Sequence, residues 1–271
     1  MKHYAKFLLV AFFTGFFCVI NCAKNGTIKE LSDIILLFGF YNVNYYPQYI
    51  MEITYWFIPL LLFQIIYGTY IYRHFCCASI YFFSRCCNRT VWFLKEMLVL
   101  YLFAVVYLFV LIFSGFMAAN LFTPVKIGQV SILLLGYYLL IHSLFLLFTT
   151  LLINILAILF TSNVSFMIVE GISLFGVAVF CLMGNYFVTQ DEFLPQYTWM
   201  LKLNPIAHLI FSVHGSSIER LNCLINVNGI SFDLNLSVFV YLAGIVIVMI
   251  SGCFIVNYHD FLNVNQEIGG I

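Results

Sequence analysis

The chain has 271 residues, of which 64% are apolar and 8% are charged, whereas soluble domains average roughly 45–50% apolar and about 25% charged residues. Its 11 basic and 11 acidic residues cancel, which excludes the cationic surface that nucleic acid binding requires. The charges lie in clusters between long uncharged runs, and a helix needs about 20 apolar residues to cross a bilayer. The composition therefore predicts an all-α, polytopic membrane protein.

The first predicted span is an apolar run, 7–20, that follows two lysines. Such a run is typical of a signal peptide or of a first transmembrane helix. The residues after it lack the small-residue pattern of a cleavage site, so we expect a retained span at 5–23. The next residues, 24–54, carry both signs of charge and one apolar run, 34–41, that is too short to cross a bilayer. We expect an external segment with an interfacial helix there.

The next two apolar runs flank the most basic segment of the chain. We predict the second and third spans at 55–72 and 97–119, separated by the loop 73–96. Loops rich in Lys and Arg stay on the cytoplasmic side of a membrane, so we expect this loop in the cytoplasm. Its basic residues are Arg73, Arg85, Arg89 and Lys95.

The longest uncharged stretch, 127–169, must contain a turn, because as one helix it would measure about 65 Å. The polar residues Thr161, Ser162 and Asn163 suit the start of a new helix. This break gives a fourth span at 130–160 and a fifth at 164–186. A break at Thr149-Thr150 is the alternative and would give seven spans.

The last predicted span, 237–256, follows the largest hydrophilic segment, 187–235, which we expect outside the cell. Within that segment, 206–218 is expected to form an interfacial or partly re-entrant helix. The six-span arrangement is one transmembrane domain, 1–271, with both termini in the cytoplasm. Cys22 and Cys223 fall in segments placed outside, so a disulfide between them is left open.

Motifs for stand-alone chemistry are absent from the sequence. It has no HExxH, no GxSxG and no GxxxxGK[ST], so the chain is not expected to hydrolyse ATP, to bind a metal or to hold a cofactor itself. His74 near Cys76 and Cys77 allows a membrane cysteine peptidase. The favoured interpretation of these cysteines is that they are membrane-facing apolar residues or acylation sites.

The end of the basic loop, 79–96, interleaves aromatic and charged residues at helical spacing. Arg85 and Arg89 are four residues apart and share a helix face, and Trp92 follows on the next turn. This pattern is typical of an amphipathic helix on the membrane surface. A docking element for a cytoplasmic partner has the same pattern.

The order of these features resembles the permease subunits of ABC-2-type ABC transporters, particularly small bacterial permeases of bacteriocin, lantibiotic or antibiotic export and immunity. The resemblance lies in six spans, a basic loop between spans two and three, Asn204-Pro205-Ile206 before the last span, and the closing run 252–260. It implies a second permease copy or a similar permease, and a separate ATP-binding cassette subunit that binds the ATP. It also implies the bacterial cytoplasmic membrane as the location and a peptide, antibiotic or lipid-like cargo.

In that family the loop between spans two and three forms a coupling helix on the ATP-binding subunit, and the loop between spans four and five makes a smaller contact. Carried over, the first contact comprises Arg85, Asn88, Arg89, Trp92, Lys95 and Glu96, and the second comprises Thr161, Ser162 and Asn163.

Glu170 and His142 are the ionisable side chains predicted deep inside spans. Such groups are costly in lipid, so they are candidates for a functional site. Two rival functions stay open at this point. One is a stand-alone immunity or binding protein that acts without turnover, and the other is the cysteine peptidase.

Overall fold

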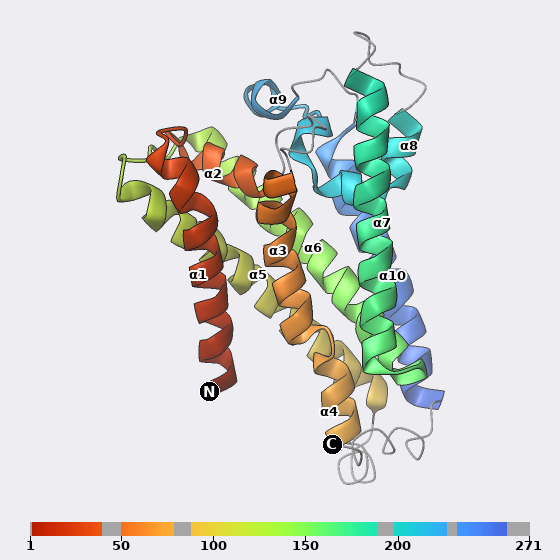
Figure 1. The fold of residues 1–271 in the computed structure, drawn as a ribbon. Helices are drawn as coiled ribbons and strands as arrows, with labels where there is room; N and C mark the ends of the chain where they lie inside the picture. The colour runs from red at the N-terminus through yellow and green to blue at the C-terminus, as the bar shows by residue number, and fades with distance from the viewer. Residues whose placement is uncertain (1, 40–49, 79–87, 189–197, 227–231, 259–271) are drawn as a thin grey trace.

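The computed structural model describes residues 2–39, 50–78, 88–188, 198–226 and 232–258 (Figure 1). Within these ranges the chain is helical and contains no strands, so the predicted all-α fold is confirmed there. In chain order the elements are α1 (Lys2–Lys24), α2 (Leu31–Phe38), α3 (Ile50–Tyr67), α4 (Tyr70–Ala78), α5 (Arg89–Asn120), α6 (Gln129–Leu159), α7 (Ser162–Val188), α8 (Thr198–Leu203), the 3-10 helices η3 (Pro205–Leu209) and η4 (Phe211–Val213), α9 (Glu219–Ile225) and α10 (Leu234–Tyr258).

Five of the described helices, α1, α5, α6, α7 and α10, are long and apolar enough to cross a membrane. Large apolar side chains stay exposed on them, among them Phe17, Phe109, Phe175 and Phe239. Exposed apolar surface of this extent is expected where a protein contacts lipid. The chain is a membrane-embedded helical protein.

The second predicted span, 55–72, is divided between two helices. α3 ends at Tyr67, and α4 begins at Tyr70 after Gly68 and Thr69. The described side chains of α3 begin only at Trp56, and α3 is not one of the five membrane-length helices. A sixth crossing therefore stays a prediction.

α6 is the central helix of the fold (Figure 1). It packs against α2, α3, α4, α5, α7, α9 and α10. Because neighbours cover most of its circumference, its buried side chains include polar ones as well as apolar ones. The buried polar residues of α6 are Ser131, His142, Ser143, Thr149, Thr150 and Asn154.

The turn between α6 and α7 lies where the sequence predicts it. α6 ends at Leu159, and the Thr161 hydroxyl accepts a hydrogen bond from the Val164 amide at 3.3 Å. α6 continues through Thr149 and Thr150, whose hydroxyls donate to carbonyls one turn earlier. The alternative break at Thr149-Thr150, and the seven spans that it implied, are therefore wrong.

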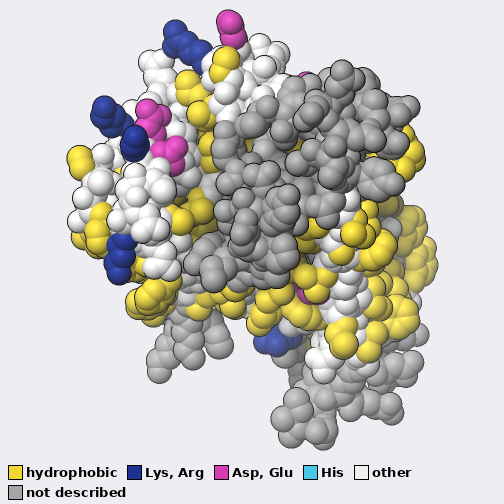
Figure 2. Space-filling model, turned by 45° about the horizontal axis from the view of Figure 1, so that its top comes forward, with side chains coloured by type: hydrophobic (Ala, Val, Ile, Leu, Met, Phe, Trp, Pro, Cys, Tyr) yellow, Lys and Arg dark blue, Asp and Glu magenta, His cyan; other side chains and the backbone are white. Residues whose placement is uncertain are grey.

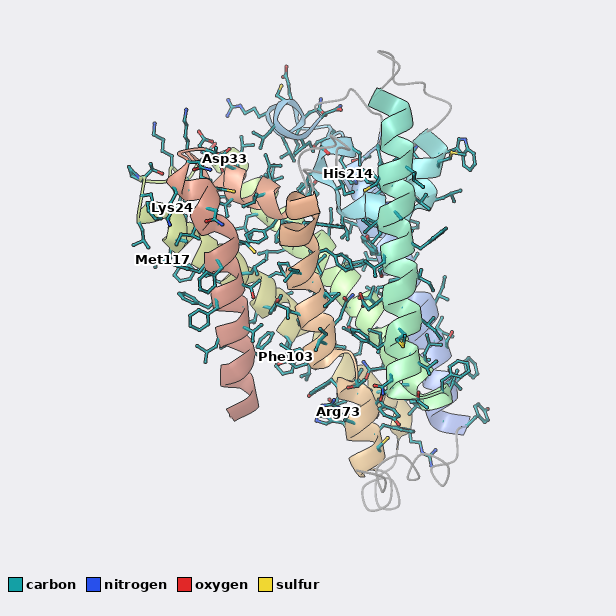
Figure 3. The ribbon with its side chains drawn as sticks, viewed as in Figure 1. Lys24, Asp33, Arg73, Phe103, Met117 and His214 are labelled. Atoms are coloured by element: carbon teal, nitrogen blue, oxygen red, sulfur yellow. The ribbon has the colours of Figure 1, made fainter. Side chains whose placement is uncertain are left out.

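The shorter helices gather at two ends of the molecule, which define the frame for the site. α2, α8 and α9 lie at one end, called here the α9 end, and α4 lies at the other, the α4 end, with the start of α1 and the end of α10 (Figure 1). Lys24, Asp33 and His214 mark the α9 end and Arg73 the α4 end (Figure 3). Figure 2 shows acidic and basic side chains near one another on the end turned toward the viewer.

Two elements expected at the membrane surface have most of their side chains buried against neighbouring elements. α2 falls on the run 34–41, but Ile34, Ile35 and Phe38 are fully buried against neighbouring helices. In place of the single interfacial or partly re-entrant helix expected at 206–218, the chain forms the two short 3-10 helices η3 and η4, whose side chains are mostly buried. Every side chain from 206 to 214 is buried, so this segment has no polar face to turn toward water, and tertiary packing rather than amphipathicity sets its path.

Candidate functional site

Three buried polar side chains from three helices meet between the helices of the bundle: Gln64 of α3, Thr149 of α6 and Glu170 of α7. Their exposed fractions are 1%, 3% and 5%. One end of the Gln64 amide lies 2.9 Å from the Thr149 hydroxyl, and the other lies 2.8 and 3.2 Å from the two carboxylate oxygens of Glu170. When the amide nitrogen faces an ionised Glu170, both ends of the amide have complementary partners. These three residues are called the Glu170 cluster.

The depth of Glu170 makes this cluster the strongest functional candidate. Glu170 lies eight residues after the first residue of α7, which corresponds to about 12 Å along the helix. The part of the chain that the structure describes supplies no cation within salt-bridge distance of its carboxylate. A carboxyl group at this depth is costly, and such groups mark pathways and switching elements in membrane proteins. The sequence singled out Glu170 but gave no signal that Gln64 was its partner.

The break between α3 and α4 lies next to the Glu170 cluster and is held by α6. The Gly68 amide donates to the Gln64 carbonyl at 2.6 Å. Beyond the break, the Tyr72 amide donates to the side-chain oxygen of Asn154 at 2.8 Å. Thr149 and Asn154 of α6 therefore contact the chain on both sides of the break, and buried amide groups that the helix end would leave unpaired are satisfied.

The second intramembrane candidate, His142, is not part of this cluster. Its Nδ1 donates to the Tyr138 carbonyl one turn earlier at 3.1 Å, and its ring stacks on the Tyr138 ring with centroids 4.1 Å apart. Its Nε2 is buried without a hydrogen-bond partner among the described residues. The structure thus keeps the two sequence-predicted candidates apart, with His142 serving the packing around α6.

The predicted coupling residues that the structure describes lie at the α4 end, at the start of α5. α5 begins at Arg89, two turns before the expected 97, and the Asn88 side chain caps it by accepting from the Val91 amide at 3.3 Å. Arg89 donates to the carbonyls of Val256 and Asn257, both at 3.3 Å. It therefore ties the start of α5 to the end of α10.

The other coupling candidates differ in exposure. Glu96 lies 3.3 Å from Nδ1 of His74, and the half-buried Trp92 ring packs against Phe75 of α4. The Lys95 side chain is exposed. Arg85 lies outside the described residues. The structure therefore brings α4, α5 and α10 together here, and among the described coupling candidates Lys95 is the basic residue whose side chain is exposed.

The second predicted contact, Thr161 to Asn163, also lies at the α4 end (Figure 1). Thr161 caps α7, and Ser162 and Asn163 form its first residues. All three are exposed or half-exposed. They are accessible to a partner, and the Thr161 hydroxyl also caps the start of α7.

A cluster that sequence reasoning missed lies at the α9 end, where His208 and His214 face Ser237 of α10. His208 Nε2 donates to the Lys202 carbonyl at 3.0 Å, and His214 Nδ1 donates to the Ile210 carbonyl at 2.7 Å. Their other ring nitrogens lie 2.9 and 2.7 Å from the Ser237 hydroxyl, which has a single hydrogen to donate. The sequence signal was faint: two histidines in an apolar stretch of a hydrophilic segment.

Burial governs the charge of these two histidines. Removal from water lowers the pKa of His208, and it lowers the pKa of His214 to about 3, against a smaller opposing effect of the Ile210 carbonyl. Both imidazoles are therefore neutral near pH 7. Their tautomers follow from the carbonyls that they face.

A groove lies between α7 and α8 at the α9 end, with a volume of about 460 Å³ and an almost wholly apolar lining. Asn204 is one of the lining residues; its amide donates to the Gly176 carbonyl at 2.8 Å and its oxygen accepts from the Ile206 amide at 3.0 Å. Apolar side chains of both helices line the walls, including Phe175 and Trp199. The groove has the character of a surface for lipid or apolar ligands.

The cysteines give no support for a peptidase or for a disulfide. Cys76 is buried, whereas the His74 side chain is largely exposed and faces Glu96. Neither Cys22 nor Cys223 forms a disulfide within the part of the chain that the structure describes. Among the described residues no three His, Cys, Asp or Glu side chains gather at metal-binding spacing.

Comparisons with known proteins add no relative. No protein-family model matches the chain, and neither a curated protein nor a solved structure matches it.

Proposed function

We propose that this protein is the membrane-spanning permease subunit of a transporter that is driven by a separate ATPase, of the ABC-2 type that its sequence resembles. The proposal includes a second permease copy or a similar permease, and a peptide, antibiotic or lipid-like cargo. ATP is bound by the partner subunit. We further propose that the protein lies in the bacterial cytoplasmic membrane with both termini in the cytoplasm.

The observation that carries the proposal is the continuity of α5 from the α4 end into the membrane layer. α5 is one helix of 32 residues, Arg89–Asn120, about 48 Å long. A partner bound at its first turns would act on a rigid rod, because a helix transmits displacement along its axis. Through Arg89 the same turns are tied to α10, so two membrane-length helices would move together.

The Glu170 cluster provides a second support for transport over simple binding. It joins α3, α6 and α7 by hydrogen bonds rather than by apolar packing alone. Ionisable residues at membrane depth mark substrate or ion pathways in membrane proteins. A stand-alone immunity or binding protein needs no such site. It stays the second candidate function.

The first prediction tests the partner. Lys95→Glu reverses the exposed charge on the second turn of α5 without breaking a contact described above. We expect the intact chain to bring down a nucleotide-hydrolysing subunit from native membranes in mild detergent, and Lys95→Glu to reduce that yield at least several-fold. Arg89→Glu is a poorer choice because it also removes the bonds to α10.

The matched control is Lys126→Glu, which makes the same reversal at an exposed position of the α9 end, where only backbone atoms of Lys126 are engaged. It should retain the wild-type yield of ATPase. If the folded wild-type chain brings down no ATPase from any native membrane preparation, the permease proposal fails. The non-turnover binding protein then becomes the better hypothesis.

A further inference from the structure

We propose that Glu170 is a proton-binding site and that its proton sets the orientation of the Gln64 amide. The two states differ in one proton and in a half-turn of one amide group. This inference stands on the hydrogen-bond geometry and does not depend on the transport proposal.

The ionised state is satisfied in one way only. A carboxylate accepts hydrogen bonds and donates none, so the Gln64 nitrogen must face Glu170, at 2.8 and 3.2 Å from its two oxygens. The Gln64 oxygen then faces Thr149 and accepts from its hydroxyl at 2.9 Å. Every polar atom of the Gln64 and Glu170 pair is matched.

The protonated state is satisfied by the opposite orientation of the same amide. A neutral carboxyl group has one O–H to donate, and the Gln64 oxygen, turned toward Glu170, accepts it. The Gln64 nitrogen then donates to the Thr149 oxygen at 2.9 Å. The Thr149 hydrogen is released to the Phe145 carbonyl, which lies 3.0 Å away on the same helix. The positions of the heavy atoms are shared by both states.

No other charge competes for this proton among the described side chains. α3 contributes Gln64, and its Tyr67 ring packs on Phe7 instead. Of the titratable groups of α6, His142 bonds to its own helix, Tyr138 stacks on His142, and Tyr137 donates to Asn235 of α10. In η3, His208 is bonded to Ser237 and to a backbone carbonyl. Proton uptake at Glu170 therefore changes the local charge by one full unit that no neighbour offsets.

The consequence concerns the α3–α4 break. Gln64 is the residue whose carbonyl accepts from Gly68 at that break, and Thr149 and Asn154 of α6 hold the chain before and after it. Proton binding replaces an ionic hydrogen bond between α3 and α7 by a neutral one, and charge-assisted hydrogen bonds are roughly twice as strong. The junction of α3 and α7 is therefore looser when Glu170 is protonated.

The test is infrared difference spectroscopy of the full-length protein in lipid discs, titrated from alkaline to acid buffer. The carbonyl stretch of a protonated carboxyl group reports Glu170 directly. We expect one titrating band that is lost in Glu170→Gln and kept in Glu219→Gln, which removes an exposed carboxyl group of α9. If folded Glu170→Gln retains every titrating band, Glu170 binds no proton and the proposal is wrong.

The link between the Glu170 proton and the Gln64 amide is measured separately, by the frequency of the Glu170 band. Gln64→Leu removes the partner of the carboxyl O–H, so the Glu170 band should move to the frequency of a non-hydrogen-bonded acid. Thr149→Val, which leaves Gln64 in place, tests the same coupling if Gln64→Leu does not fold, and should shift the band less. Thr149→Ser keeps the hydroxyl and should leave the band unchanged. A band that is unmoved in folded Gln64→Leu or Thr149→Val overturns the coupling.

Discussion

At the scale of single residues, the buried polar side chains have unequal uses. The hydroxyls of Ser143 and Thr150 on α6 donate to their own helix, which satisfies them locally. The His208–Ser237–His214 cluster is different, because two acceptor nitrogens share one hydroxyl hydrogen. One nitrogen is always without a hydrogen bond from Ser237, so the α9 end contains a buried group that is incompletely paired.

A pH dependence follows from these histidines. In the folded chain the pKa of His214 is lowered from 6.5 to about 3 by burial, so below about pH 6.5 the unfolded chain takes up a proton that the folded chain does not. The free energy of unfolding should therefore decrease as the pH falls from 6.5 toward 3. His214→Gln should show a smaller decrease in melting temperature over this range in detergent.

The control for that prediction is Ser237→Ala. It removes the shared hydroxyl and should cost about 1–3 kcal/mol at every pH, because a buried acceptor loses its partner. It leaves both imidazoles buried, so the slope with pH should resemble that of the wild-type chain. A His214→Gln variant whose melting temperature falls with acid as steeply as that of the wild type would refute the assignment.

At the scale of elements, α1 and α5 approach each other closely at two glycines. A Cβ at Gly15 would overlap the Leu111 carbonyl and the Ser114 hydroxyl, and a Cβ at Gly115 would lie 2.8 Å from Val19. Small residues at such crossings let backbones approach within membranes, where packing rather than the hydrophobic effect joins helices. The glycines therefore fix how α1 lies on α5.

The corresponding prediction is a pair of identical substitutions. Gly15→Ala should destabilise the protein by roughly 1–3 kcal/mol, the usual cost of overpacking. Gly136→Ala, in α6 where no atom lies within 4 Å of the added Cβ, should be neutral or stabilise by about 0.5–1 kcal/mol through the better helix propensity of alanine. Thermal unfolding in detergent measures both. Equal effects of the two substitutions would contradict the packing argument.

At the scale of the whole molecule, orientation in the membrane is the property to be tested. Arg73 and the start of α5 lie at the α4 end, whereas α9, with its exposed Cys223, lies at the other end. The positive-inside rule places the α4 end in the cytoplasm. α9 should then face the outside.

Cysteine labelling measures this directly. In a chain without its other cysteines, Cys223 should react with a membrane-impermeant maleimide on intact cells. Lys95→Cys in a cysteine-free chain should react only after the membrane is opened, since Lys95 is exposed at the α4 end. The reverse pattern would invert the topology and remove the cytoplasmic contact on which the permease proposal depends.

What the sequence by itself determined is the local part of the fold. The length of each apolar run predicts a membrane helix because crossing needs a fixed number of residues, and the polar residues Thr161 to Asn163 predicted the start of α7 because capping is a short-range effect. Glu170 could also be recognised from the sequence alone, because it is an ionisable residue flanked by long uncharged runs.

Only the tertiary structure decided which side chains meet. Gln64 and Glu170 are 106 residues apart in the sequence, and their contact depends on the rotation of α3 and α7 against α6, which no local pattern encodes. The end of α3 at Tyr67, the buried path of η3 and η4, and the start of α5 at Arg89 likewise depend on neighbours that cover or tie these segments. Apolar runs specify that a helix enters the membrane, and packing between helices decides where it ends and what it touches.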